Sequence, residues 1–195
     1  MQRFENLNKT LIIISGISSS GKTTYAKKIN ELYNYEILSL DDYKEYYYEK
    51  YGFVSEIERK NLWNLAKKTY IAEIIANCRQ NKTIIVEYPF DTSWQEVFDY
   101  IKNEYNYDIY IINCNSRNFD DIWNSREDRD SICIDRPKCL TASKYIKGVL
   151  YENNGKLNEE YKEKKRMEYI NNKYTSLNGD YVISDSKIDF GTKLK

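Results

Sequence analysis

The residues best suited to chemistry form one short loop near the start of the chain, Gly16-Ile17-Ser18-Ser19-Ser20-Gly21-Lys22-Thr23. This loop matches the phosphate-binding pattern G-x-x-x-x-G-K-[ST] at every fixed position. The glycines let the backbone wrap closely around phosphate oxygens, Lys22 would reach the β- and γ-phosphates, and the Thr23 hydroxyl would be a magnesium ligand. We therefore predict a site for a nucleoside triphosphate, most simply ATP, together with Mg²⁺.

The flanking segments support that interpretation of the phosphate loop (residues 16–23). Thr10–Ser15 is a continuous apolar run typical of a strand buried on both faces, and a helix is predicted over 22–33. The positive end of that helix would point at the same anion. The predicted nucleotide-binding residues are Gly16, Ser18, Ser19, Ser20, Gly21, Lys22, Thr23 and Thr24.

An acidic pair, Asp41 and Asp42, follows the second predicted strand in the stretch "SLDDYK". The carboxyl ends of parallel strands line the ligand crevice, so this pair should face the phosphate loop. One carboxylate would accept the proton of an attacking hydroxyl, and the other would help to hold magnesium or substrate. The residues alone leave either Asp possible as the base, and a solvated turn or helix cap is the plainer alternative.

A second acidic position is Glu87, at the end of the apolar stretch "IIVEY". A carboxylate at the tip of a buried strand is costly unless it is paired or faces the crevice. We predict that Thr23, Asp41 and Glu87 contribute to the magnesium site, Glu87 acting through water. Contact with the substrate, or a salt bridge at the strand end, would explain Glu87 nearly as well.

Arginines follow the fourth predicted strand. They are candidates for closing over the triphosphate and neutralising the transferring phosphoryl group. Arg126 and Arg129 lie three residues apart, so that one helical face would present both, and we favour this pair. The full set is Arg117, Arg126, Arg129 and Arg136.

Strands and helices alternate along the chain, which predicts a three-layer α/β/α fold with a mostly parallel five-stranded sheet. We expect a single domain over residues 1–195, with a helical, arginine-bearing lid at approximately 117–150. Capping boxes at Ser55–Glu58 and Ser93–Glu96 begin two of the helices. The predicted strands are 10–15, 35–39, 82–88, 107–114 and 180–185; the predicted helices are 22–33, 55–80, 93–104, 118–127 and 156–175.

Composition excludes several classes of function. The chain has 30 basic and 30 acidic residues, so it offers no overall basic field for a long nucleic acid. It has no histidine, which rules out a histidine-based zinc site or catalytic triad. Its four cysteines lack metal-binding spacing and are expected to be free thiols, and no apolar run is long enough to span a membrane. We expect a soluble, cytoplasmic protein.

Taken together, these motifs resemble the small P-loop kinases. That group includes uridine-kinase-like and nicotinamide-riboside-kinase-like enzymes, gluconate and shikimate kinases, zeta toxins and phage-type polynucleotide kinases. "GISSSGKTT" and "LDDYK" look most like the nucleoside-kinase branch, in which an Asp of such a segment serves as base. "IIVEY" is similar to a strand of that branch that ends in Glu-Gly, with Tyr88 replacing the glycine.

"DDYK" is also similar to the "DDYR" segment of polynucleotide kinases. That resemblance would make Asp41 the base and places Lys44 where those enzymes have an arginine. In these families the adenine lies between the lid and the loop after the last strand, which implies a position near Asp185-Ser186. A switch GTPase is disfavoured, because the chain lacks N-K-x-D after Asp185 and D-x-x-G after the third predicted strand.

The function expected from the sequence is transfer of the γ-phosphate of ATP, with Mg²⁺, to a hydroxyl of a small, nucleoside-like metabolite. The predicted catalytic residues are Lys22, Asp41, Asp42, Arg126 and Arg129. Tyrosines 43, 46, 47 and 48 either line the acceptor pocket or belong to the core. The alternatives are a polynucleotide 5′-hydroxyl kinase, a zeta-toxin-like kinase, and a nucleotide-binding regulator that transfers no phosphate.

Overall fold

The computed structural model describes residues 4–133 and 159–188. The strands are β1 (Thr10–Ser15), β2 (Glu36–Ser39), β3 (Ile84–Glu87), β4 (Asp108–Asn113) and β5 (Tyr181–Ser184). The α-helices are α1 (Lys22–Tyr33), α2 (Leu40–Tyr51), α3 (Glu56–Arg79), α4 (Gln95–Tyr105), α5 (Phe119–Cys133) and α7 (Glu159–Ile170). Short 3₁₀ turns, η2 (Thr92–Trp94) and η4 (Asp185–Lys187), follow β3 and β5.

The five strands form one sheet in the order β2-β3-β1-β4-β5, and every pairing between them is parallel. β1 lies at the centre and pairs with β3 on one side and β4 on the other. It is fully buried, as its continuous apolar run predicts. The predicted α/β fold with a parallel five-stranded sheet is confirmed.

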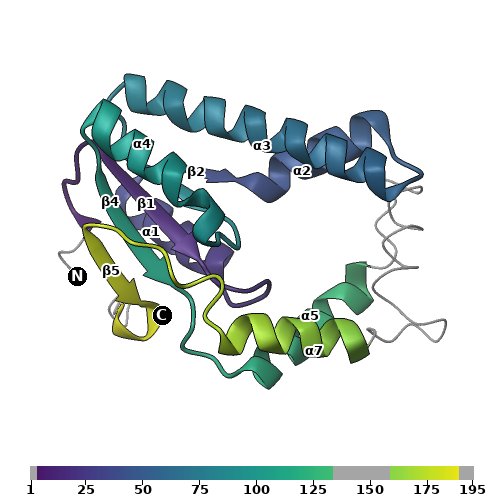
Figure 1. The fold of residues 1–195 in the computed structure, drawn as a ribbon. Helices are drawn as coiled ribbons and strands as arrows, with labels where there is room; N and C mark the ends of the chain where they lie inside the picture. Colours follow the sequence, from purple (N-terminus) through teal and green to yellow (C-terminus); the bar gives the residue numbers. More distant parts are fainter. Residues whose placement is uncertain (1–3, 134–158, 189–195) are drawn as a thin grey trace.

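Helices cover both faces of the sheet (Figure 1). Alternate residues of β1 point to opposite faces: Leu11 and Ile13 pack in the core beneath α3 and α4, whereas Ile12 and Ile14 pack against α1. The carboxyl ends of all five strands therefore meet at one edge, where the phosphate loop leaves β1.

The sequence misses one helix, α2. Asp41 and Asp42 lie in its first turn, not in a bare turn after β2, and negative charge there is stabilised by the helix dipole. The tyrosines that follow pack on both sides of the helix: Tyr48 is buried, whereas Tyr46 is 54% exposed. No clear helical stripe of aliphatic residues marks the segment, which explains the omission.

The two predicted capping boxes differ in outcome. The hydroxyl of Ser55 accepts a hydrogen bond from the Glu58 amide at 3.2 Å, so this helix start is confirmed. The Ser93–Glu96 box is wrong. The Asp91 side chain instead accepts from the amide of Ser93 at 3.1 Å, a 3₁₀ turn follows, and α4 begins at Gln95.

α5 and α7 lie beside each other and extend from the edge of the sheet that carries the phosphate loop (Figure 1). Their contact is a small apolar cluster of Ile17, Phe119, Ile122 and Trp123 with partly buried tyrosines. α5 falls inside the predicted lid, and residues 134–150 of that lid lie outside the described residues. The described cysteines, Cys78 and Cys114, are free and buried. Within residues 4–133 and 159–188, no helix is long and apolar enough to cross a membrane.

Candidate active site

The phosphate loop forms a tight cradle at the end of β1. Gly16 and Gly21 have φ angles of 148° and 102°, in the left-handed region that favours glycine. A Cβ at Gly16 would lie 2.7 Å from the Cys114 carbonyl oxygen and 2.7 Å from the Ser20 hydroxyl. The loop therefore requires glycine at position 16 both for its conformation and for its close packing against β4.

Lys22 bends back over this cradle. Its Nζ donates a hydrogen bond to the Ile17 carbonyl oxygen at 2.9 Å, and the residue is only 8% exposed. The ammonium is therefore held at the mouth of the loop, where the phosphates of a nucleotide would bind. Its position in the first turn of α1 adds the partial positive charge of the helix end to the same place.

Glu87 lies beside Thr23, the other functional residue of the loop. β3 pairs with β1 so that Glu87 is opposite Ile14, and the Thr23 hydroxyl donates to Glu87 Oε1 at 3.1 Å. Burial raises the pKa of Glu87, although hydrogen bonds from Thr23 and Ser39 and the charge of Lys22 act in the opposite direction. Glu87 Oε2 is buried and makes no hydrogen bond of good geometry within the described residues.

This corner suits a magnesium ion. A hydroxyl and a carboxylate with a buried, unsatisfied oxygen are hard oxygen donors, and Mg²⁺ in phosphate-transfer sites typically takes only one or two protein ligands together with phosphates and waters. Among the described residues, no group of three or more His, Cys, Asp or Glu side chains is placed to hold a metal ion.

The two aspartates of α2 lie in different surroundings. Asp41 forms an ion pair with Lys44 at 2.6 Å, and its charge is among the causes that raise the pKa of Glu87. The Asp41 side chain itself is 59% exposed. Burial, and to a smaller extent the charge of Asp41, raises the pKa of Asp42. The charge of Asp42 in turn is one of the causes that raise the pKa of Tyr43.

Tyr88 extends the site beyond Glu87. Lys44 lies over its ring, with Nζ 5.4 Å from the ring centroid, and the indole Nε1 of Trp63 donates to its hydroxyl at 3.3 Å. Its amide donates to the Ile14 carbonyl oxygen at 3.4 Å, at the start of the phosphate loop. The Tyr88 ring thus lies beside Lys44, the ion-pair partner of Asp41.

The arginines are arranged differently from the sequence-based preference. Arg126 is 8% exposed and lies beside the paired rings of Trp123 and Tyr161, whose centroids are 6.2 Å apart, with its guanidinium carbon 5.5 and 5.3 Å from them. In this arrangement it joins α5 to α7. Arg129 is on α5, its side chain is not among those described, and Arg136 lies outside the described residues.

Arg117 touches the phosphate loop. Its Nη1 donates to the Ser19 carbonyl oxygen at 3.4 Å, and its Nη2 is anchored by the Asp121 carbonyl oxygen at 2.8 Å and the Ser125 hydroxyl at 2.6 Å. The sequence places it just after β4, and β4 is next to β1. That adjacency is the signal that would have favoured it over the later arginines.

Asp185, near the predicted adenine position, is almost fully buried. Its carboxylate accepts from the amides of Asn115 and Ser116 at 3.2 and 2.9 Å and from the Ser116 hydroxyl at 2.7 Å. It therefore fixes the loop between β4 and Arg117. Ser186, which follows in η4, donates its amide to the same carboxylate at 3.1 Å.

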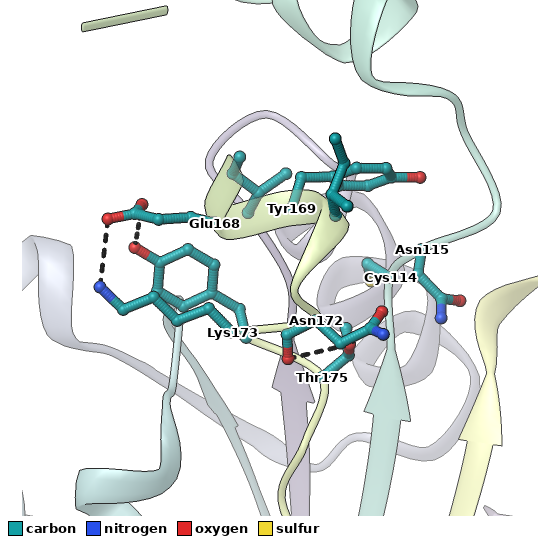
Figure 2. A pocket seen from close by; sticks show the side chains of 10 residues that line it. Cys114, Asn115, Glu168, Tyr169, Asn172, Lys173 and Thr175 are labelled. Atoms are coloured by element: carbon teal, nitrogen blue, oxygen red, sulfur yellow. Dashed lines mark hydrogen bonds and ion pairs between the residues drawn. The ribbon is translucent and has the colours of Figure 1, made fainter. Parts of the chain in front are cut away.

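A pocket of about 150 Å³ lies between the phosphate loop and the end of α7 (Figure 2). Glu168 at its rim accepts hydrogen bonds from Lys165 at 2.6 Å, Tyr174 at 2.7 Å and Lys173 at 3.1 Å. Burial would raise the pKa of Glu168, but these bonds and charges lower it to about 2. The pocket is lined by Ile17, Cys114, Asn115, Glu168, Tyr169, Ile170, Asn172, Lys173, Tyr174 and Thr175.

The chain is similar to solved structures of kinases. A protein from Chloroflexus aurantiacus described as a "putative kinase" is 16% identical and matches with a TM-score of 0.63 over 95% of this chain and 92% of that one. The chain has the fold of the P-loop kinases. A shikimate kinase from Acinetobacter baumannii, solved with shikimate, is 17% identical, with a TM-score of 0.52 over 93% of this chain and 86% of that one. No protein-family model and no curated protein matches the chain.

Proposed function

We propose that this protein is a magnesium-dependent kinase that transfers the γ-phosphate of ATP to a hydroxyl of a small, nucleoside-like metabolite. The observation that carries the proposal is the Thr23–Glu87 hydrogen bond of 3.1 Å, which joins the phosphate loop to the end of β3. Asp41 lies in the first turn of α2, which follows the neighbouring strand β2. The P-loop kinase fold supports the proposal. Phosphoryl transfer needs little more than such positioning and charge.

In the proposed reaction Asp41 accepts the proton of the acceptor hydroxyl as its oxygen attacks the γ-phosphorus. The ion pair with Lys44 at 2.6 Å would orient the Asp41 carboxylate. Asp42 lies next to Asp41, and its charge helps to raise the pKa of Tyr43. We assign it no proton transfer.

The phosphates would be held by the amides of residues 18–24 and by Lys22, which exchanges the Ile17 carbonyl for a phosphate oxygen. Thr23 and Glu87 would hold magnesium, which would supply positive charge to neutralise the phosphates. Arg117, through its contact with Ser19, is the arginine best placed to reach the triphosphate. To take that role, Arg126 would have to leave its position beside the rings of Trp123 and Tyr161.

The experiment is a screen for acceptors. Nucleosides, sugars and vitamins are tested by thermal shift with a non-hydrolysable ATP analogue and Mg²⁺, and those that stabilise the protein are then tested for transfer from ATP. We expect at least one hydroxyl compound to bind and to be phosphorylated. ATP binding without transfer to any compound in the screen would instead support a nucleotide-binding regulator.

A further inference from the structure

A lysine on α3 lies close to the proposed acceptor site. The Nζ of Lys67 is 4.3 Å from the ring centroid of Trp94 and 5.6 Å from that of Trp63. Trp94 belongs to η2, which follows β3 after residues 88–91, and its ring centroid is 6.1 Å from that of Tyr88, the residue next to the end of β3. Lys67 therefore lies near the edge of the sheet where the strands end. The aliphatic stem of a lysine can cover aromatic surface in this way while its ammonium stays available to solvent.

Lys67 is connected to Asp41 through a continuous series of contacts. Asp41 pairs with Lys44, Lys44 lies over Tyr88, and the Tyr88 hydroxyl accepts from Trp63 at 3.3 Å. Trp63 is one helical turn before Lys67 on the same face of α3. We call Trp63, Lys67, Tyr88 and Trp94 the lysine–tryptophan subsite.

Lys44 and Lys67 differ in their ion pairs. Lys44 is neutralised by Asp41 at 2.6 Å. Lys67 forms no ion pair with any carboxylate of residues 4–126 or 159–188, in contrast to Lys102, Lys165 and Lys173. A positive charge that lies on aromatic rings and is not paired with a carboxylate of those described residues attracts an anion.

From this arrangement we propose that the acceptor carries an anionic group, a phosphate or carboxylate, which binds Lys67 at the lysine–tryptophan subsite while its hydroxyl faces Asp41. The inference rests on the proposed kinase function and makes its substrate more specific. Lys44, already paired with Asp41, orients the base, and Lys67 selects the charge of the acceptor.

Tryptophan fluorescence tests the anion site without any turnover. Trp94 and Trp123 are each 2% exposed, and Trp63 is the more accessible of the three tryptophans. Quenching of Trp63 fluorescence by iodide, an anion, should therefore depend on the positive charge of Lys67. Lys67→Met should lower iodide quenching roughly twofold because the local anion concentration falls. Acrylamide, a neutral quencher, should be unaffected, and the exposed neighbour Lys68→Met should change neither.

Matched acceptors test the substrate class. Ribose and ribose 5-phosphate, and the methyl ester of shikimate and shikimate, are compared by binding in the presence of an ATP analogue and by transfer from ATP. We expect the anionic member of a pair to have a KM at least about tenfold lower. Lys67→Met should raise that KM with little change in kcat, and Lys67→Arg should restore it.

Each outcome bears on a different claim. Iodide quenching that is unchanged in Lys67→Met overturns the anion site, whatever the acceptors do. Neutral acceptors that bind and react as well as anionic ones overturn the substrate class but leave the kinase function intact. Transfer to no acceptor, with the quenching difference present, removes the kinase function and with it the acceptor role of Lys67.

Discussion

Glu87 is the residue at which the fold and the proposed chemistry conflict most directly. The strand that carries it must be apolar to occupy the sheet, yet its last side chain is a buried carboxylate with one oxygen that makes no hydrogen bond of good geometry among the described residues. Such a group costs stability in the absence of a cation and becomes favourable when a cation is bound. Glu87 should therefore link stability to magnesium and pH.

Replacing Glu87 with Gln should raise the free energy of unfolding of the nucleotide-free protein at neutral pH. The folded-state pKa lies above the ordinary value of 4.5, so the charged carboxylate destabilises the fold above the folded-state pKa, and this penalty is absent below 4.5. The gain should thus appear at pH 7 and disappear in acid, as measured by urea unfolding at a series of pH values. A variant less stable than wild type at pH 7, with unchanged magnesium dependence, would contradict this role.

Comparing Gly16 with Gly52 separates the effect of a positive φ angle from the effect of steric contacts made by an added Cβ. Both have positive φ, but a Cβ at Gly52 would meet nothing within 4 Å, whereas one at Gly16 would meet Cys114 and Ser20 at 2.7 Å. We expect Gly52→Ala to cost about 1 kcal/mol of stability and to leave ATP binding intact. Gly16→Ala should weaken ATP binding at least about tenfold by calorimetry, because the loop must shift away from the phosphates. Equal ATP affinity in the two variants would contradict the cradle geometry.

At the scale of elements, the docking of α7 depends on one polar network. Glu168 joins Lys165 of the same helix to Tyr174 and Lys173 in the segment that follows, and the Tyr174 carbonyl oxygen accepts from the Ser15 hydroxyl at 2.6 Å. The arm formed by α5 and α7 is thereby tied to the end of β1, immediately before the phosphate loop. The same segment bounds the pocket in Figure 2.

Glu168→Gln should destabilise the protein at neutral pH. The pKa of Glu168 is lowered from 4.5 to about 2, so its contribution is present above pH 4.5 and is lost as the pH falls toward 2. One pKa unit corresponds to about 1.4 kcal/mol, and solvent screening at this partly open site should reduce the total to about 1–2 kcal/mol. Urea unfolding at pH 7 and pH 3 should show the difference between variant and wild type shrinking in acid. A difference that is the same at both pH values would contradict it.

The strands, the long helix α3 and the phosphate loop were predictable because each depends on local pattern: an apolar run, a capping serine and a fixed spacing of glycines and lysine. What the sequence could not give was adjacency. The pairing of β1 with β3 and β4 places Glu87 beside Thr23 and Arg117 beside Ser19, and neither contact follows from spacing along the chain. Arg126 has the right residue type and lies within the expected lid, but its guanidinium packs against the rings of Trp123 and Tyr161. Lys67 belongs to no sequence motif, and its contact with Trp94 depends on how α3 packs against η2, so the sequence does not predict it.

At the scale of the whole molecule, the balance of charge constrains the acceptor. With 30 basic and 30 acidic residues, the protein has no net field that would draw in a polynucleotide. The local positive charge at Lys67 instead suits a compact anion.

An oligonucleotide with a 5′-hydroxyl should therefore be a poor acceptor. Its affinity, measured by fluorescence anisotropy at several salt concentrations, should be weak and should change little with salt, because few phosphates are neutralised. A logarithmic salt slope steeper than about −3 with efficient 5′-phosphorylation would favour the polynucleotide kinase alternative.

The central claim is that Asp41, in the first turn of α2, receives the proton while the phosphate loop holds ATP. The most direct test measures γ-phosphate transfer to the best acceptor by wild type, Asp41→Asn and Asp42→Asn, with ATP affinity measured in parallel. We predict that Asp41→Asn lowers kcat about 10²–10⁴-fold with ATP affinity unchanged, whereas Asp42→Asn retains most activity. Full activity in Asp41→Asn would contradict the account.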